Sequence, residues 1–284
     1  DAGSDIFLNY TVCCSFSRFK QHDAQNRVRE LNRVGAEIGR NVADKSDRKV
    51  VVAGSVGPTG EIMAPVGALS HAIAVEMFHE QADGLKEGGA DVAWLEAISA
   101  PEEYRAAAEA FSLAELPWCG TMSFDTAGRT MMGVTSSDLS TLASSLEPAP
   151  IAYGANCGTG ASDLLRTVLG FANSESALPI IAKGNAGIPK YVHGHIHYDG
   201  TPELMADYAA LARDCGASII GGCCGTMPDH LRLMREALDE RPRNAPPSLD
   251  QIVAALGAFS SESDGTGANV APVRERRGRR RRSA

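Results

Sequence analysis

The chain has few aromatic residues and no long apolar run. Aromatic residues make up only 6% of the 284 residues. No stretch approaches the roughly 18 consecutive apolar residues that a membrane-spanning helix needs. No charged-then-apolar leader opens the sequence, so nothing in it argues for secretion. These absences exclude an integral membrane protein, and we expect a cytoplasmic one.

Basic residues are scarce over most of the chain, whose formal net charge is −8. A nucleic-acid partner is therefore not expected for the body. The exception is residues 273–284, VRERRGRRRRSA, with seven arginines against one glutamate. We divide the chain into a barrel domain at 1–257 and a disordered Ser/Gly-rich and Arg-rich tail at 258–284, which we expect to be dispensable for chemistry. The alternative is that the tail is an arm for RNA, an anionic membrane or an acidic partner.

The body repeats one pattern, a short apolar run followed by a turn and a segment with helical spacing. Seven such units occur, with their apolar runs at 5–8, 49–53, 91–95, 118–123, 150–155, 179–183 and 217–221. Strands that alternate with helices predict a parallel sheet. Seven units in about 240 residues favour a closed eight-stranded (β/α)8 TIM-type barrel over an open sheet. The count is one short, so we expect this chain to lack the first strand–helix unit.

The cysteines do not form the pattern of a disulfide framework, because their number is odd in a large α/β chain. The seven are Cys13, Cys14, Cys119, Cys157, Cys215, Cys223 and Cys224. Cys223 and Cys224 are adjacent, lie among glycines and follow an apolar strand. Neighbouring Cα atoms are only about 3.8 Å apart, whereas disulfides prefer about 5.5 Å or more. This pair is therefore better explained as two metal ligands.

A third candidate ligand is Cys157, in GANCG, which also lies between a strand and a helix. The strand ends of a barrel meet at one rim, where the active sites of this fold are found. Three thiolates with an open fourth position are typical of a catalytic zinc site, so we predict one zinc ion per chain. For Cys119 and Cys215 we favour the alternative of buried core cysteines.

GANCG followed by GGCCGT resembles the homocysteine S-methyltransferase family, most closely its bacterial betaine–homocysteine methyltransferase-like proteins. GSVGPTG at 54–60, WLEAIS at 94–99 and GNAGIP at 184–189 also fit. The resemblance implies a barrel whose zinc is held by Cys157, Cys223 and Cys224. It also implies an enzyme, a methyltransferase that moves a methyl group to the homocysteine thiol and yields methionine.

Four further residues are candidates for binding homocysteine. A carboxylate at a strand end, Glu96, suits the ammonium group, as the resemblance also implies. Backbone amides of the Gly-rich segment that contains Gly54 and Ser55 suit the carboxylate. Asn156, beside Cys157, either orients the site through its amide or is a simple turn residue.

Several alternatives stay open at this stage. We favour betaine or a similar onium compound as methyl donor, with a corrinoid partner protein or a non-catalytic zinc-binding descendant as alternatives. The stretch Tyr10–Cys14 departs from the family pattern, and the Asp-Gly motif that the resemblance places in the first strand–helix unit is not found. His193, His195 and His197 are a rival metal set, although we favour a loop that folds over the substrate. A homo-oligomer also stays open.

Overall fold

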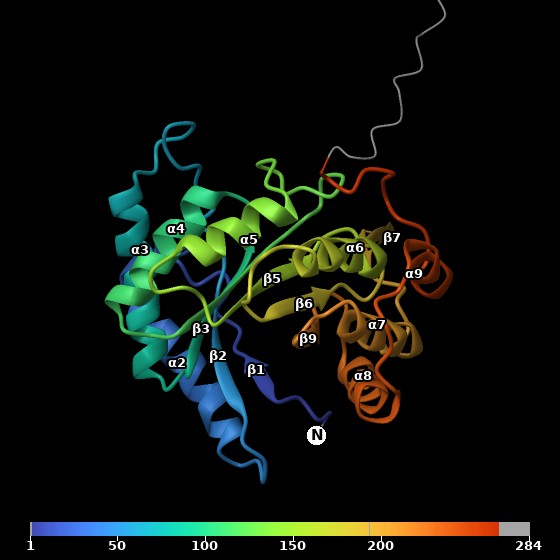
Figure 1. Cartoon of the computed structure of the whole chain (residues 1–284). Helices are drawn as coiled ribbons and strands as arrows, with labels where there is room; N and C mark the ends of the chain where they lie inside the picture. The colour runs from blue at the N-terminus through green and yellow to red at the C-terminus, as the bar shows by residue number, and fades with distance from the viewer. Residues whose placement is uncertain (1, 193, 267–284) are drawn as a thin grey trace, which may run out of the picture.

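The protein is built around one parallel β-sheet that curls on itself. The computed structural model describes residues 2–192 and 194–266. Within them the curled sheet has seven strands in the order β1-β2-β3-β4-β5-β6-β9 (Figure 1). These are β1 (Ile6–Leu8), β2 (Val51–Val56), β3 (Val92–Ile98), β4 (Trp118–Met122), β5 (Ala152–Cys157), β6 (Ile180–Gly184) and β9 (Ile219–Gly222). Every pairing in it is parallel, as strand–helix units require.

Helices lie outside the curled sheet and connect its strands (Figure 1). They are α1 (Phe16–Lys20), α2 (Val28–Ala43), α3 (His71–Glu87), α4 (Pro101–Leu113), α5 (Ser136–Ser145), α6 (Ala161–Ala172), α7 (Pro202–Asp214), α8 (Pro228–Glu240) and α9 (Leu249–Leu256), with a 3-10 turn at Gln25–Arg27. Local signals start them: Ser70 caps α3 by accepting a hydrogen bond from the Ile73 N–H. Pro101 begins α4, where a missing N–H costs no helical bond. Among the described residues, no helix combines the length and apolarity that crossing a bilayer requires.

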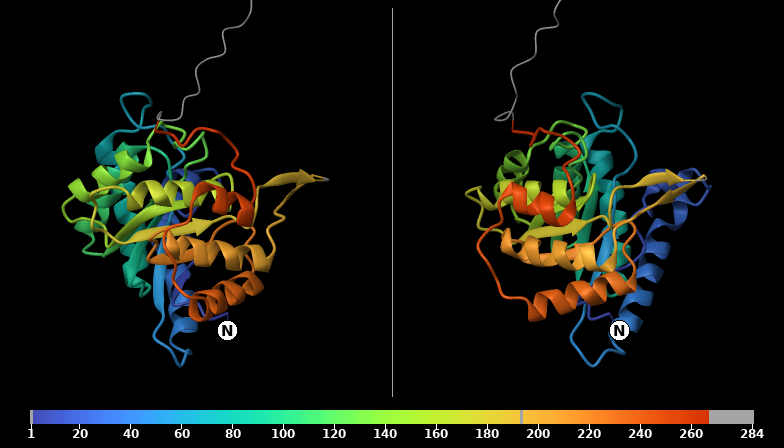
Figure 2. Two further views of the ribbon diagram at one scale, coloured as in Figure 1. Left: turned by 45° about the vertical axis from the view of Figure 1, so that its right-hand side comes forward. Right: turned by 90° about the vertical axis from the view of Figure 1, so that its right-hand side faces the viewer.

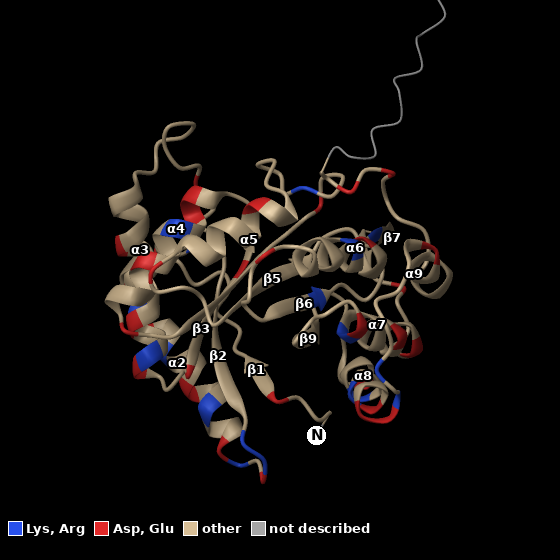
Figure 3. Cartoon of the chain, in the orientation of Figure 1, with Lys and Arg blue, Asp and Glu red and all other residues tan. Residues whose placement is uncertain are grey.

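Strand register decides which side chains fill the inside of the curled sheet. Trp94 lies opposite Cys119, and Cys119 opposite Ala152, so their side chains share one face. They form a buried apolar layer. Nearer the carboxyl ends of the strands, the same face carries a polar layer: Glu96, Thr121, Asn156 and Lys183. Elsewhere charged residues lie mainly on the helices and loops (Figure 3). The charged side chains of Glu96 and Lys183 inside the sheet are therefore exceptional.

A larger core lies between the sheet and the helices. Trp118 of β4 packs against Tyr104 and Phe111 of α4, with ring centroids 5.4 and 6.0 Å apart. All three side chains are buried. Burying a large apolar side chain contributes about 1.5–3 kcal/mol, so these contacts fix α4 firmly on the sheet.

The sheet stays open between its first and last strands. In the described part of the chain, β1 and β9 are edges with no pairing between them. On the β1 side, α2 leaves Val34, Ile38 and Val42 exposed by 37%, 62% and 52%. The apolar residues that α2 buries most fully are Val28 and Ala36. The prediction of a TIM-type barrel that lacks one strand–helix unit is confirmed.

The first part of the segment predicted as a disordered tail contacts the body. The guanidinium of Arg166 on α6 lies 4.4 Å from the centroid of the Phe259 ring. It also donates a 2.9 Å hydrogen bond to the backbone oxygen of Ser261. The Arg-rich stretch at 273–284 lies outside the described residues. The domain boundary at 257 and the dispensability of the tail therefore stay predictions.

A two-stranded antiparallel hairpin projects from the body between β6 and α7 (Figure 2). Its strands are β7 (Lys190–Val192) and β8 (His195–His197), and all six residues are exposed. Sequence periodicity predicted only a loop here. His195 and His197 belong to no group of three metal-ligating side chains among the described residues. His193 lies outside the described residues.

Candidate metal centre

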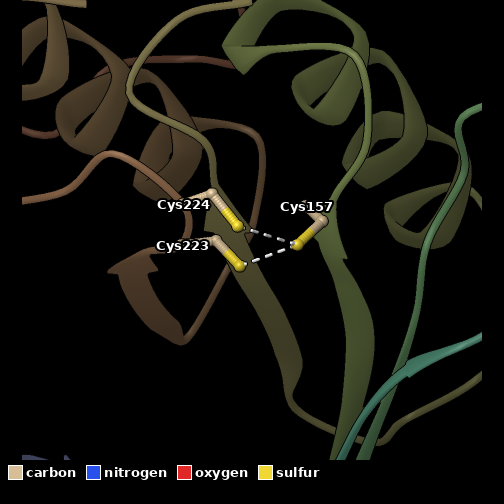
Figure 4. A group of neighbouring side chains, drawn as sticks. All are labelled: Cys157, Cys223 and Cys224. Atoms are coloured by element: carbon tan, nitrogen blue, oxygen red, sulfur yellow. Dashed lines mark hydrogen bonds between the residues drawn. The ribbon is translucent and has the colours of Figure 1, made fainter. Parts of the chain in front are cut away.

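Cys157, Cys223 and Cys224 meet at the carboxyl-terminal edge of the sheet. Cys157 ends β5, and the other two follow β9, with β6 between these strands. Cys157 Sγ lies 2.9 Å from Cys223 Sγ and 3.8 Å from Cys224 Sγ. The three side chains point toward one another (Figure 4). In the described ranges they are the one group of three side chains placed to hold a metal ion.

The backbone turns these side chains toward one another. Cys157 has a φ of 57°, in the left-handed region that residues other than glycine rarely adopt, and Gly158 follows with 74°. Such a conformation costs about 1–3 kcal/mol and is found mainly at functional sites. On the other side, the Cys223 N–H donates a 2.7 Å hydrogen bond to the Gly184 oxygen. Both cysteine loops are thus fixed to the ends of their strands.

The sulfur positions suit a tetrahedral metal ion. Two sulfurs that each lie 2.3 Å from zinc are about 3.8 Å apart at a tetrahedral angle. The Cys157–Cys224 separation matches this value, and the Cys157 and Cys223 sulfurs, at 2.9 Å, would have to move about 0.9 Å apart to reach it. All three are free thiols, and Cys224 is exposed, which leaves access for a fourth ligand. The donor set therefore fits zinc with an open position.

The contacts within the cluster shift the pKa values of Cys157 and Cys224 in opposite directions. The hydrogen bond of the Cys157 thiol to Cys223 raises the pKa of Cys157, and a second one to Cys224 adds to this. The same contacts lower the pKa of Cys224 to about 2, because the thiols of Cys157 and Cys223 donate hydrogen bonds to its thiolate. The cluster therefore stabilises negative charge on sulfur.

The sequence left two interpretations of Asn156 open, an amide that orients the site and a simple turn residue, and its contacts are compatible with both. Its Oδ1 accepts hydrogen bonds from the Ala97 N–H at 2.9 Å and from Thr121 Oγ1 at 2.7 Å, which ties β5 to β3 and β4. Its Nδ2 lies 3.7 Å from Cys223 Sγ and donates to it. Asn156 is 1% exposed. It is a structural residue whose remaining donor is directed at a candidate metal ligand.

Asn185 and Tyr198 contact the site, although sequence analysis gave neither a role. Asn185 donates to the Gly158 oxygen at 3.0 Å and accepts from the Cys224 N–H at 3.1 Å, so one amide joins the two cysteine loops. Burial, together with a hydrogen bond to Cys224, raises the pKa of Tyr198 to about 12. The GNAGIP motif contained a signal for Asn185, since a polar residue follows a strand there.

Below the cysteines, Glu96 is held between two partners. Ser55 Oγ donates to Glu96 Oε1 at 2.5 Å, and Lys183 Nζ lies 2.5 Å from Oε2. The charge of Glu96 is close enough to Cys224 to oppose its ionisation. The structure therefore brings Glu96 and Ser55 to the site together with Lys183, which sequence analysis did not select.

Two sequence features lie apart from this centre. A Cβ added to Gly54 would lie 2.7 Å from the Leu85 side chain of α3, so this glycine allows the helix to approach β2 and does not line the site. Cys13 is exposed and Cys14 half-buried. Neither joins a metal-ligating group within the described residues.

Cys119 and Cys215 lie in the core, as predicted, with 3% and 1% exposure. Burial raises the pKa of each to about 12. At pH 8 only about one such thiol in 10,000 is ionised, so we expect neither to react with iodoacetamide in the folded protein. Exposed Cys13 is expected to react fully. Peptide mass spectrometry checks this, and equal labelling of Cys119 and Cys13 would contradict it.

Comparison with known proteins identifies the family. The family model described as homocysteine S-methyltransferase matches residues 1–238. The chain is 29% identical to methionine synthase of Mycobacterium tuberculosis over 272 residues, and 28% identical to that of Mycobacterium leprae over 249. These alignments cover 90% and 84% of this chain but only 22% and 20% of the relatives, so the chain spans about a fifth of their length.

Solved structures agree on the fold. The homocysteine methyltransferase MmuM from Escherichia coli, in its oxidised form, superposes with a TM-score of 0.68 at 21% identity. The metallated form of MmuM gives 0.67 at the same identity, and both matches cover 83% of this chain and 80% of MmuM. Since the family model covers most of the sequence, this chain belongs to the homocysteine S-methyltransferase family.

Proposed function

We propose that this chain binds one zinc ion and homocysteine, and that it transfers a methyl group to the homocysteine thiol, giving methionine. The observation that carries the proposal is the convergence of three sulfurs, those of Cys157, Cys223 and Cys224, at the carboxyl-terminal ends of β5 and β9. Three thiolates leave one tetrahedral position for a substrate sulfur. Membership of the family agrees with this assignment.

Methyl transfer to a thiol needs such a site, because only the thiolate is nucleophilic. A free thiol, with a pKa near 8.5, is mostly protonated at neutral pH. A zinc ion in this site supplies the positive charge that deprotonates a coordinated thiol. The chain's own residues arrange the ligands. Asn185 joins the two cysteine loops, and Asn156 donates to Cys223. Glu96 supplies a buried carboxylate for the substrate ammonium.

For the methyl donor we favour betaine or a similar onium compound. A corrinoid partner protein is the second candidate, and one observation favours it. Onium groups are usually held against the faces of aromatic rings, yet Trp94 and Trp118 are only 1% and 2% exposed. Neither tryptophan is available to face a donor, which leaves Tyr198, in contact with Cys224, as an aromatic side chain at the site.

The test is a methylation assay on the zinc-loaded chain with homocysteine. Betaine, S-methylmethionine, dimethylsulfoniopropionate and a methylated corrinoid protein are each offered, and methionine is measured by mass spectrometry. We expect one donor to support turnover. Stabilisation by homocysteine in a thermal shift assay without turnover on any donor would identify the non-catalytic zinc-binding descendant instead.

A further inference from the structure

The short loop that carries Cys157 into α6 has an unfavourable backbone conformation. Cys157, Gly158 and Gly160 have φ values of 57°, 74° and 136°. A positive φ is costly for cysteine, so contacts with the rest of the chain have to hold the loop in place. Asn185 provides one of them by donating to the Gly158 oxygen at 3.0 Å. The remaining contacts come from α6 and from the chain beyond α9.

Asp163, in the first turn of α6, is the centre of these contacts. Its Oδ2 accepts hydrogen bonds from Thr159 Oγ1 at 3.1 Å and from the Ser260 N–H at 2.9 Å. Ser260 Oγ also donates to Thr159 Oγ1 at 3.1 Å. Asp163 Oδ1 accepts from Arg166 at 2.8 Å, and these two side chains are only 9% and 8% exposed. One buried carboxylate therefore joins the Cys157 loop to a segment that lies far away in the sequence.

Helix α5 shows the ordinary use of an aspartate at this position. Asp138 is the third residue of α5, and it accepts from both the N–H and the hydroxyl of the N-cap residue Thr135. In α6 the N-cap residue is Gly160, which has no side chain to cap the helix. Asp163, the third residue of α6, is directed instead to the loop and to Ser260. Its contacts are thus not those that start a helix.

The segment 257–266 is itself fixed to two parts of the body. Near α6, the Gly257 oxygen accepts from Ser162 Oγ at 2.8 Å, next to the contacts of Arg166 with this segment. Further on, the segment packs directly on the loop after β4, where a Cβ added to Gly128 would lie 2.2 Å from the Asp264 backbone. Figure 1 shows it running from α9 past α6 toward this loop. The segment is therefore a fixed anchor for Asp163 and Thr159.

We propose that Asp163 and Thr159 are positioning residues which, together with the segment 257–261, hold Cys157 in its metal-binding conformation. The inference rests on the zinc site of the proposed function, and adds to it a part of the chain that follows the barrel. Without these contacts the Cys157 backbone would relax and carry its sulfur away from the other two. The predicted dispensability of the tail then concerns the Arg-rich stretch at 273–284 and not residues 258–261.

The test measures two properties of the full chain. Zinc affinity is measured by competition with a chromophoric chelator, and the visible absorption of the Co²⁺-loaded chain reports on the geometry of the sulfur ligands. Thr159→Val keeps the shape of the side chain but removes the hydroxyl that contacts Asp163 and Ser260. We expect it to weaken zinc binding about 10-fold, as loss of a ligand-orienting contact typically does, and to change the Co²⁺ spectrum. Thr159→Ser, which keeps the hydroxyl, is expected to restore both.

A second variant acts from the other end of the contact. Ser260→Pro removes the backbone N–H that donates to Asp163, so we expect it to weaken zinc binding as Thr159→Val does.

Thr135→Val is the matched control, because it deletes the equivalent hydroxyl–aspartate contact at the start of α5. We expect it to lower the melting temperature while leaving the zinc affinity and the Co²⁺ spectrum unchanged. Unchanged zinc affinity in Thr159→Val would overturn the inference. An equal loss of affinity in Thr135→Val would also overturn it, since the effect would then be one of stability alone. If the unsubstituted chain binds no zinc, the proposed function itself fails, and the inference fails with it.

Discussion

Replacing Cys224 by serine is expected to remove the zinc ion and abolish methyl transfer. Serine keeps its proton at neutral pH, so the substitution deletes one of three thiolates from the site. Loss of a residue that only supports a ligand typically costs about 10- to 100-fold in metal affinity, so loss of a ligand is expected to cost more than 100-fold. Elemental analysis after dialysis measures the zinc, and methionine formation measures the activity.

Cys215→Ser is the matched control, because it makes the same chemical change in the core cluster and away from the metal centre. We expect it to keep its zinc and its activity. We also expect Cys224→Ser to stay folded by circular dichroism, since none of the three site cysteines belongs to a hydrophobic core cluster. A Cys224→Ser protein with full zinc content and activity would refute the assignment of the centre.

The fold could be predicted from sequence because its signals are local. Apolar runs of strand length alternate with segments of helical spacing, and capping residues such as Ser70 and Pro101 mark where α3 and α4 begin. Alternation implies a parallel sheet, and the number of units favours a barrel, whose strands follow chain order, as the structure has them.

Two parts of the fold depend on neighbours and could not be predicted in this way. Helical periodicity shows that α2 has an apolar stripe, but not whether a partner covers it, and Ile38 is 62% exposed. The β7–β8 hairpin has the short sequence KYVHGHIH, whose apolar residues Tyr191, Val192 and Ile196 are exposed. A short segment with no buried face does not distinguish a loop from a hairpin that projects away from the core.

The site also has residues that local sequence signals predict and residues that depend on neighbouring strands. Adjacent cysteines among glycines indicate a metal centre because neighbouring residues do not readily form a disulfide, and Cys157 follows from the rule that strand ends meet at one edge. Lys183 gives no such signal, because a lysine at the end of an apolar strand is ordinarily solvated. Lys183 lies 87 positions after Glu96 in the sequence, and only the pairing of the strands between them brings the two side chains together. The position of Gly54 in its strand was also not predictable. Its residue type suggested a binding loop, but a Cβ added there would face Leu85 of α3.

Breaking the Glu96–Lys183 pair is expected to destabilise the fold strongly. Removing one partner leaves the other as an uncompensated buried charge, and such changes typically cost about 3–5 kcal/mol. Glu96→Gln and Lys183→Met should each lower the melting temperature by roughly 10 °C, given about 2–4 °C per kcal/mol for chains of this size. Thermal unfolding followed by circular dichroism measures the change.

The double variant Glu96→Gln/Lys183→Met should recover much of this loss, because it leaves no unpaired charge in the sheet. Replacing both members of a buried pair is often nearly neutral, whereas removing one is not. The control is the exposed pair Arg232–Glu236 on α8, whose side chains are 51% and 49% exposed. There, Arg232→Met and Glu236→Gln should each change stability by less than about 0.5 kcal/mol. If the losses of unfolding free energy caused by Glu96→Gln and Lys183→Met add in the double variant, the two side chains are not energetically coupled. The Glu96–Lys183 pair then does not stabilise the fold.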